Sequence, residues 1–268
     1  MIWIVLLTFL CYGYVALSFA LSGYRGQMPP ARPMTTVMLV GFILHSIWLW
    51  GTIISPGPAL NLNLPESINL FSWLLAGIYL SGIGFRSLYP VGVLITPALF
   101  CALLLVPWLS PIHPVIESIS DPVLIAHLLL SLVGYGALTV AAGTAILYGL
   151  QDRALHQKTF SGLPIALPPL TVLEELLFHA VTVSWFLSLG SILSGMAFAY
   201  QSQGLLLIFN HKAVFALLTF LTLSGLILGR WRSGWRGRKA AGWLLTAYIF
   251  LAVAYFGVKV VTQVLLGR

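Results

Sequence analysis

Four histidines lie inside long apolar stretches of the chain and are the side chains best suited to chemistry. They are His45, His127, His179 and His211. A neutral imidazole carries one donor and one acceptor nitrogen, so it can bind a metal ion or form hydrogen bonds. Inside a hydrocarbon layer each ring nitrogen needs a partner, because an unsatisfied polar group is costly there. These four histidines are therefore the candidate cofactor-binding residues.

The depth of each histidine in a membrane can be estimated, because an α-helix rises about 1.5 Å per residue. His127 follows Pro122 by five residues, and His211 stands at the start of its apolar stretch, so both lie near one side of the membrane. His45 lies near the middle of its stretch, and His179 lies toward the opposite side. We predict an outer pair, His127 with His211, and a deeper pair, His45 with His179.

Two neutral imidazoles that face each other at one depth can bind the iron of a haem from both sides. We therefore hypothesise that His127 and His211 are axial ligands of a haem b, and that His45 and His179 are further haem-binding residues. His127 also shares a helix face with the small residue Ser131, which would let a flat macrocycle approach the backbone.

The alternative is that a histidine only hydrogen-bonds a carbonyl group of a neighbouring helix and binds no cofactor. This interpretation is favoured for His179, which lies close to the polar start of its stretch. Apart from Lys212 at the outer start of its stretch, the apolar stretches contain one lysine, Lys259, and no aspartate, which argues against a proton- or sodium-coupled pump. Cys11 and Cys101 lack metal-type spacing and indicate neither a disulfide scaffold nor a redox motif.

Membrane-spanning helices are the elements that must hold these histidines. Of the 268 residues, 59% are hydrophobic and 7% are charged, whereas a soluble domain carries about 25% charged residues. A helix needs about 20 mostly apolar residues to cross a bilayer. Eight stretches qualify: 2–23, 36–54, 67–86, 90–108, 122–150, 172–200, 206–229 and 240–266. We predict an all-α, polytopic transmembrane bundle of about eight helices. Residues 1–268 should form a single integral membrane domain without enzymatic activity.

The basic residues follow alternate stretches and predict the orientation of the helices. Five of the thirteen lysines and arginines fall between the last two stretches. Cytoplasmic loops are enriched in Lys and Arg, so both termini should lie outside and this cluster in the cytoplasm. The cluster fits anionic lipid better than nucleic acid, and we expect a multi-pass protein of the bacterial inner (plasma) membrane. Its members are Arg230, Arg232, Arg236, Arg238 and Lys239.

Five segments carry a family resemblance when they are taken in order. They are His45-Ser-Ile-Trp-Leu, Leu64-Pro-Glu-Ser-Ile-Asn-Leu-Phe-Ser-Trp73, His127-Leu-Leu-Leu-Ser-Leu-Val-Gly-Tyr-Gly-Ala, Gly234-Trp-Arg-Gly-Arg-Lys-Ala-Ala241 and Tyr255-Phe-Gly-Val258. Together they resemble the cytochrome c assembly proteins of the CcsA and HemX type, over nearly the whole chain. The resemblance implies a protein that handles haem. By position, His45 matches the family's first transmembrane histidine, and His127 matches its first outward-facing one.

The chain also departs from the family pattern. The segment from Gln203 to Lys212 contains no tryptophan, although the family has a tryptophan-rich, haem-presenting loop there. The family's second transmembrane histidine is replaced near Gly229, and its last outward-facing histidine has no counterpart before Arg268. The resemblance is therefore to the short branch that lacks this loop. It implies an accessory role and not the complete attachment of haem to an apocytochrome.

These observations predict a haem-binding inner-membrane accessory protein in cytochrome c assembly or haem homeostasis. The expected partners are haem, the lipid bilayer and other cytochrome c assembly or membrane proteins, with no nucleic acid. The alternative is a cofactor-free membrane scaffold or regulatory protein whose histidines join neighbouring helices. A small-molecule transporter ranks lower, because the sequence shows neither an inverted repeat nor broken helices at matching positions.

Overall fold

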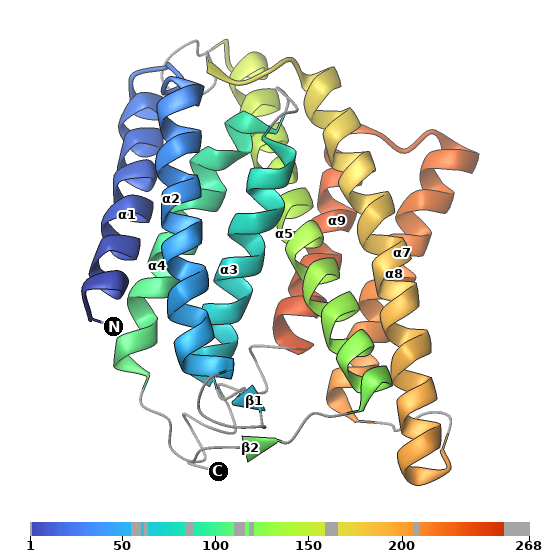
Figure 1. The fold of residues 1–268 in the computed structure, drawn as a ribbon. Coiled ribbons are helices and arrows are strands. Elements are labelled where there is room, and N and C mark those ends of the chain that lie inside the picture. The colour runs from blue at the N-terminus through green and yellow to red at the C-terminus, as the bar shows by residue number, and fades with distance from the viewer. Residues whose placement is uncertain are drawn as a thin grey trace. The chain divides into compact units, whose positions relative to one another are not determined.

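The computed structural model describes residues 2–54, 60–61, 64–83, 88–109, 116–117, 121–158, 166–205 and 210–254. These residues form eight α-helices (Figure 1). The helices are α1 (Ile2–Tyr24), α2 (Ala31–Leu49), α3 (Leu64–Gly82), α4 (Gly92–Leu105), α5 (Pro122–His156), α7 (Leu170–Gln203), α8 (His211–Ser233) and α9 (Gly237–Ala252). The shorter elements are a π-helix (Trp50–Ile54), two 3-10 helices (Tyr89–Val91 and Val106–Trp108) and an antiparallel pair, β1 (Leu60–Asn61) with β2 (Ile116–Glu117).

The predicted all-α transmembrane bundle is confirmed. Six helices in the described part of the chain are long and apolar enough to cross a membrane, and these runs contain α1, α2, α4, α5, α7 and α8. Helices α3 and α9 are the remaining two of the predicted eight. The predicted eighth span continues to residue 266, beyond the described part. The predicted orientation, with both termini outside, stays a prediction.

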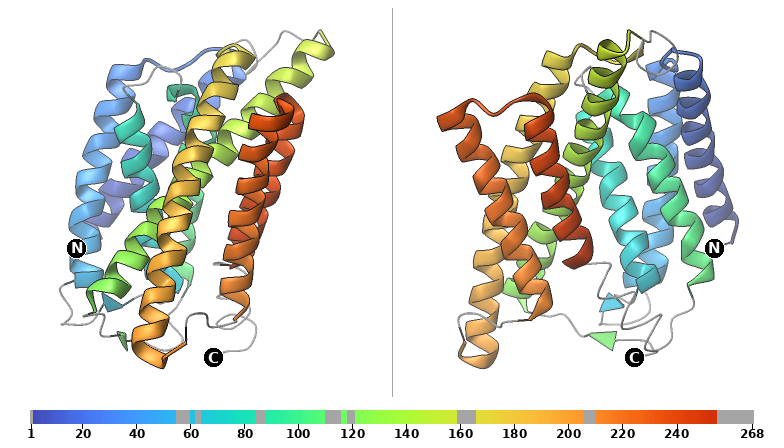
Figure 2. Two further views of the ribbon diagram at one scale, coloured as in Figure 1. Left: turned by 90° about the vertical axis from the view of Figure 1, so that its right-hand side faces the viewer. Right: turned by 180° about the vertical axis from the view of Figure 1, so that it is seen from behind.

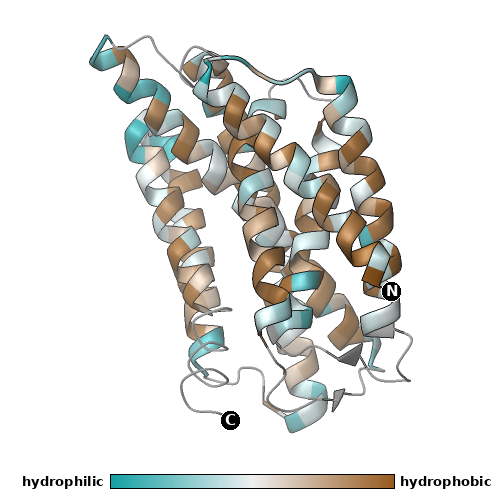
Figure 3. Ribbon diagram, turned by 90° about the vertical axis from the view of Figure 1, so that its left-hand side faces the viewer, coloured by the Kyte–Doolittle hydropathy of each residue, from teal (hydrophilic) through white to brown (hydrophobic). Residues whose placement is uncertain are grey.

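The helix exteriors match a lipid environment. Figure 3 shows hydrophobic residues along most of the length of the helices in view. Aromatic side chains stand exposed near helix ends: Trp3 at 74%, Tyr24 at 86%, Trp108 at 85% and Trp231 at 86%. Tryptophan and tyrosine favour the membrane–water interface, because their rings are apolar and each carries one polar group. The exposed aromatic residues therefore mark the ends of membrane-spanning segments.

The chain divides into two compact units, which are described separately. The first unit comprises Met1–Ser118 and Ile146–Leu176, and the second comprises Ile119–Ala145 and Leu177–Arg268. Helices α5 and α7 each contribute residues to both units. In the first unit, α1 packs against α2 and α4, and α3 packs against the same two helices, so that the four form a closed ring. The prediction of a single membrane domain is not tested by this division.

Helix starts in the second unit are set by short polar side chains. Asp121 Oδ1 accepts the Val123 N–H at 2.7 Å, which caps α5, and Asn210 Oδ1 accepts the Ala213 N–H at 2.8 Å, which caps α8. Such caps satisfy N–H groups that have no partner within the helix. They fix where α5 and α8 begin, and so the positions of His127 in the second turn of α5 and of His211 at the start of α8.

The start of α7 differs from expectation. The sequence Thr171-Val-Leu-Glu174 predicts a capping box with Thr171 just before the helix, and this prediction is wrong. The helix already begins at Leu170, and the Pro169 carbonyl accepts the Val172 and Leu173 N–H groups at 3.0 and 3.2 Å. The φ angle of proline suits the start of a helix, so the helix starts earlier than the threonine suggests.

The Gly234-Trp-Arg-Gly motif ends α8 and starts α9, which lie side by side in both views of Figure 2. Gly234 has a φ of 61°, a left-handed conformation that disfavours residues with a side chain. Its N–H donates to the Arg230 carbonyl at 3.2 Å, and the Trp235 N–H donates to the Gly229 carbonyl at 3.1 Å. The Trp235 indole packs on Gly229, and Lys239 Nζ lies 3.8 Å from the centre of an indole ring. The motif therefore forms the turn between α8 and α9, within the basic cluster.

Candidate functional site

His127 is held by helix α7 through one ring nitrogen. It lies in the second turn of α5 and is half-buried. Its Nδ1 lies 2.7 Å from the backbone carbonyl oxygen of Ser191 and 3.4 Å from the hydroxyl of Ser194. A carbonyl oxygen can only accept a hydrogen bond, so Nδ1 carries the proton. The neutral ring therefore has its lone pair on Nε2.

Nε2 of His127 has no hydrogen-bond partner among the described residues. A histidine that ligates a metal commonly donates its other N–H to a backbone carbonyl, which fixes the tautomer and orients the ring. The Ser191 carbonyl provides this arrangement. This tautomer leaves the Nε2 lone pair of His127 available to a hydrogen-bond donor or a metal ion.

Close packing limits how the His127 ring can turn. A Cβ built on Gly195 would lie 3.0 Å from Cε1 and 3.1 Å from Nδ1 of the imidazole. Only glycine lets the α7 backbone approach the ring this closely without displacing it. The ring is therefore located by a hydrogen bond on one edge and by a backbone contact.

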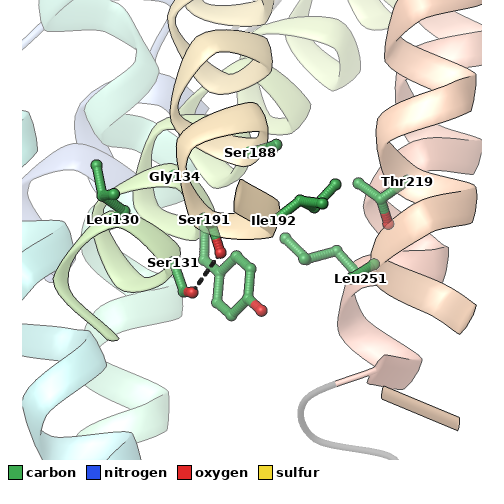
Figure 4. Close-up of a pocket in the computed structure, with 10 residues that line it drawn as sticks. Leu130, Ser131, Gly134, Ser188, Ser191, Ile192, Thr219 and Leu251 are labelled. Atoms are coloured by element: carbon green, nitrogen blue, oxygen red, sulfur yellow. Dashed lines mark hydrogen bonds between the residues drawn. The ribbon is translucent and has the colours of Figure 1, made fainter. Parts of the chain in front are cut away.

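A small pocket lies one helical turn from His127, among α5, α7, α8 and α9 (Figure 4). Its lining includes Ser131, Ser191, Thr219 and Leu251. Ser131 Oγ donates to the His127 carbonyl at 2.7 Å, so in the 2.6 Å contact of the two serines Ser191 is the donor. Both hydroxyl protons of this pair are used. The pair thus offers hydrogen-bond acceptors, which suits water better than an anionic group such as a propionate.

His45 has a different environment, in the first unit. It is fully buried on α2, with Nε2 2.7 Å from Asn69 Oδ1 and Nδ1 3.4 Å from the Tyr12 hydroxyl. The Trp48 ring stacks on the imidazole, with ring centroids 5.4 Å apart and planes at 30°. Both nitrogens of His45 therefore already have partners in the protein.

The other two predicted ligands lie at the surface of the second unit. His211 is the first residue of α8 and is exposed, and His179 on α7 is also exposed. No hydrogen bond or ring contact joins His127 to His211 among the described residues. The pairing of His127 with His211 stays a prediction, as does the assignment of all four histidines to haem.

No group of three His, Cys, Asp or Glu side chains in the described residues could hold a metal ion. A haem iron needs only one or two axial ligands, and the neutral imidazole of His127 with its lone pair on Nε2 fits that requirement. His45 in this conformation does not fit, because neither nitrogen is available. The motif Tyr255-Phe-Gly-Val258 and Lys259 lie outside the described residues.

Sequence reasoning missed the residues that contact these histidines. Asn69 and Tyr12 were not candidates, and neither was the Ser191 carbonyl. Asn69 carried a usable signal, since an amide within an apolar helix must find a partner. The role of a backbone carbonyl such as that of Ser191 has no sequence signal at all.

The fold defines a multi-pass membrane protein, and within its described residues the imidazole of His127 has a free Nε2. The chain belongs to the cytochrome c assembly protein family, whose model matches residues 4–266. The predicted resemblance is confirmed. No solved structure matches the chain.

Several relatives are similar to the chain. An uncharacterised 28.8 kDa protein of Azospirillum brasilense is 40% identical over 141 residues, covering 53% of this chain and 52% of the relative. Inner membrane protein YpjD of Escherichia coli (strain K12) is 27% identical over 146 residues, covering 54% of each. Each of these matches spans about half of the relative. Protein HemX of Brevibacillus brevis is 22% identical over 257 residues, covering 95% of this chain and 94% of HemX.

Proposed function

We propose that this protein binds haem b through His127 and serves as an accessory in cytochrome c assembly or haem homeostasis. The observation that carries the proposal is the bond from His127 Nδ1–H to the Ser191 carbonyl at 2.7 Å. In the neutral ring this bond places the lone pair on Nε2, where iron could bind it. Haem would supply the redox-active iron, and the chain would bind it, orient its ligand and keep it within the membrane.

The family supports this proposal, since the product of cytochrome c assembly contains haem. One relative of Chlorella vulgaris is named cytochrome c biogenesis protein CcsA, and it is 25% identical over 238 residues, covering 75% of this chain and 74% of CcsA. The name of YpjD supports a location in a bacterial inner membrane. We propose that the chain has no enzymatic activity and that its partners are haem, lipid and other assembly proteins.

In this proposal His211 would be the second residue to hold the haem iron. It stands at the first turn of α8, where an exposed imidazole can turn toward a ligand without breaking a hydrogen bond within the described residues. His179 is also exposed, but it lies on a different part of α7 from the His127 contacts. His127 therefore ranks first among the ligands and His211 second.

The absorption spectrum of the detergent-purified protein tests the proposal. Cells supplied with a haem precursor should yield a protein with a Soret band in the oxidised form and sharp bands after reduction with dithionite. H127A should lose the sharp reduced bands, whereas H179A should keep them. A preparation that remains colourless after addition of haemin would contradict the proposal.

A cofactor-free scaffold is the second candidate, and the His45 environment favours it. There a buried histidine joins helices through hydrogen bonds and needs no cofactor. A colourless protein that loses stability in H45A would select this function.

A further inference from the structure

The surroundings of His45 determine which of its nitrogens holds the proton. The Asn69 side-chain carbonyl oxygen, 2.7 Å from Nε2, can only accept, so Nε2–H donates to it. Nδ1 then carries the lone pair, and the Tyr12 hydroxyl donates to it at 3.4 Å. His45 and His127 thus hold opposite tautomers, each fixed by a carbonyl oxygen of a different helix.

Both partners of His45 are themselves buried, with 2% exposure for Tyr12 and 2% for Asn69. The Tyr12 ring meets the imidazole edge-on, with centroids 5.7 Å apart, and the Trp48 ring covers a face. Nδ1 therefore has a lone pair but no open approach. A macrocycle could reach iron-binding distance only if these rings moved apart.

The helices around His45 are also too close for such a movement to be local. A Cβ built on Gly41 of α2 would lie 2.9 Å from Cys11 Cβ and 3.3 Å from the Tyr12 ring on α1. Across the next interface, Trp73 Nε1 of α3 donates to Ser46 Oγ of α2 at 2.8 Å. Opening a haem site at His45 would require the separation of α2 from both neighbours.

We infer that His45 is a positioning residue that joins α1, α2 and α3, and that it is not a ligand of the iron that His127 is proposed to bind. A buried polar residue can fix the register of packed helices, because any other register leaves it unsatisfied. His45 has this role through one hydrogen bond to each neighbouring helix. The exclusion of His45 as an iron ligand rests on the proposed function, whereas its role in helix packing does not.

The packing role is tested in the absence of haem by a double-mutant cycle on the full chain in detergent. H45A and N69A should each lower the apparent melting temperature by about 2–10 °C, because each leaves a buried polar partner unsatisfied. The loss in H45A/N69A should be clearly smaller than the sum of the two single losses. Strictly additive losses would overturn the packing role.

The variant H45Q tests whether His45 is an iron ligand, because the glutamine amide N–H can still donate to Asn69. H45Q should recover at least half of the melting temperature lost in H45A, and its oxidised and reduced spectra should match those of the wild-type protein. A well-folded H45Q that has lost the sharp reduced bands would make His45 an iron ligand and overturn the inference. A wild-type protein that binds no haem would refute the proposed function, and the double-mutant cycle would still decide the packing role.

Discussion

Gly195 of α7 lies directly against the imidazole of His127 on α5, so that a Cβ at position 195 would stand 3.0 Å from Cε1 of the ring. This contact predicts that G195A displaces the ring and weakens its bond to the Ser191 carbonyl. Residues that orient a metal ligand typically change affinity by about 10–100-fold when mutated. We expect G195A to weaken haemin binding about 10-fold in a spectroscopic titration.

G190A is the matched control for G195A. It lies on the same helix, and its Cβ would stand 3.4 Å from a methyl carbon of Leu130, an ordinary contact. G190A should bind haemin as the wild-type protein does. Equal weakening in both variants would show that the effect comes from helix packing and not from the His127 ring.

Ser72 allows a prediction about stability, because its hydroxyl is buried without a hydrogen-bond partner in the described residues. Its residue exposure is 1%. Burial of an unpaired hydroxyl costs about 1–3 kcal/mol by protein mutational data, so S72A should leave the melting temperature unchanged or raise it. Thermal unfolding in detergent measures this change. A fall of several degrees would mean that the hydroxyl has a partner that stabilises the fold.

The contact of Trp235 with Gly229 predicts the behaviour of the α8–α9 turn. A side chain at position 229 would overlap the indole, so G229A should force the turn to rearrange and should lower the apparent melting temperature. Overpacking typically costs about 1–3 kcal/mol. G242A on α9 is the control, since nothing lies within 4 Å of its added Cβ. Alanine favours helix over glycine by about 1 kcal/mol, so G242A should be neutral or stabilising.

The helices could be predicted from sequence because apolar length alone defines a membrane span. The stretches 122–150 and 172–200 are longer than the about 20 residues that a span needs, and α5 and α7 have 35 and 34 residues. The start of helix α3 was harder to predict. Its first turn, Leu64-Pro-Glu-Ser, is polar, so the predicted span begins at residue 67 and not at Leu64, where the helix starts. Helix ends were less predictable, because caps and prolines compete for the first turn.

The histidine environments could not be predicted to the same degree. Sequence spacing gives the depth of His45 and His127, but the rotation of each helix is set by packing against its neighbours. The predicted pairing of histidines assumed that rings at one depth face each other. The nearest partners are instead Asn69 and the Ser191 carbonyl, and a carbonyl is present at every residue.

The predicted orientation can be tested with single cysteines at exposed helix ends. Ser202 near the end of α7 and Ser233 at the end of α8 are both exposed. In a background with C11S and C101S, a membrane-impermeant maleimide added to sealed right-side-out vesicles should label S202C. It should label S233C only after the vesicles are permeabilised. The reverse pattern would place the basic cluster outside and contradict the positive-inside assignment.

The most direct test of the central claim, that His127 gives Nε2 to haem iron, is a haemin titration of the haem-free wild-type protein beside H127A. The wild-type protein should show a saturable shift of the Soret band and sharp reduced bands, and H127A should show neither at the same haemin concentrations. Identical titrations of the two proteins would contradict the claim and leave His127 as a contact between α5 and α7.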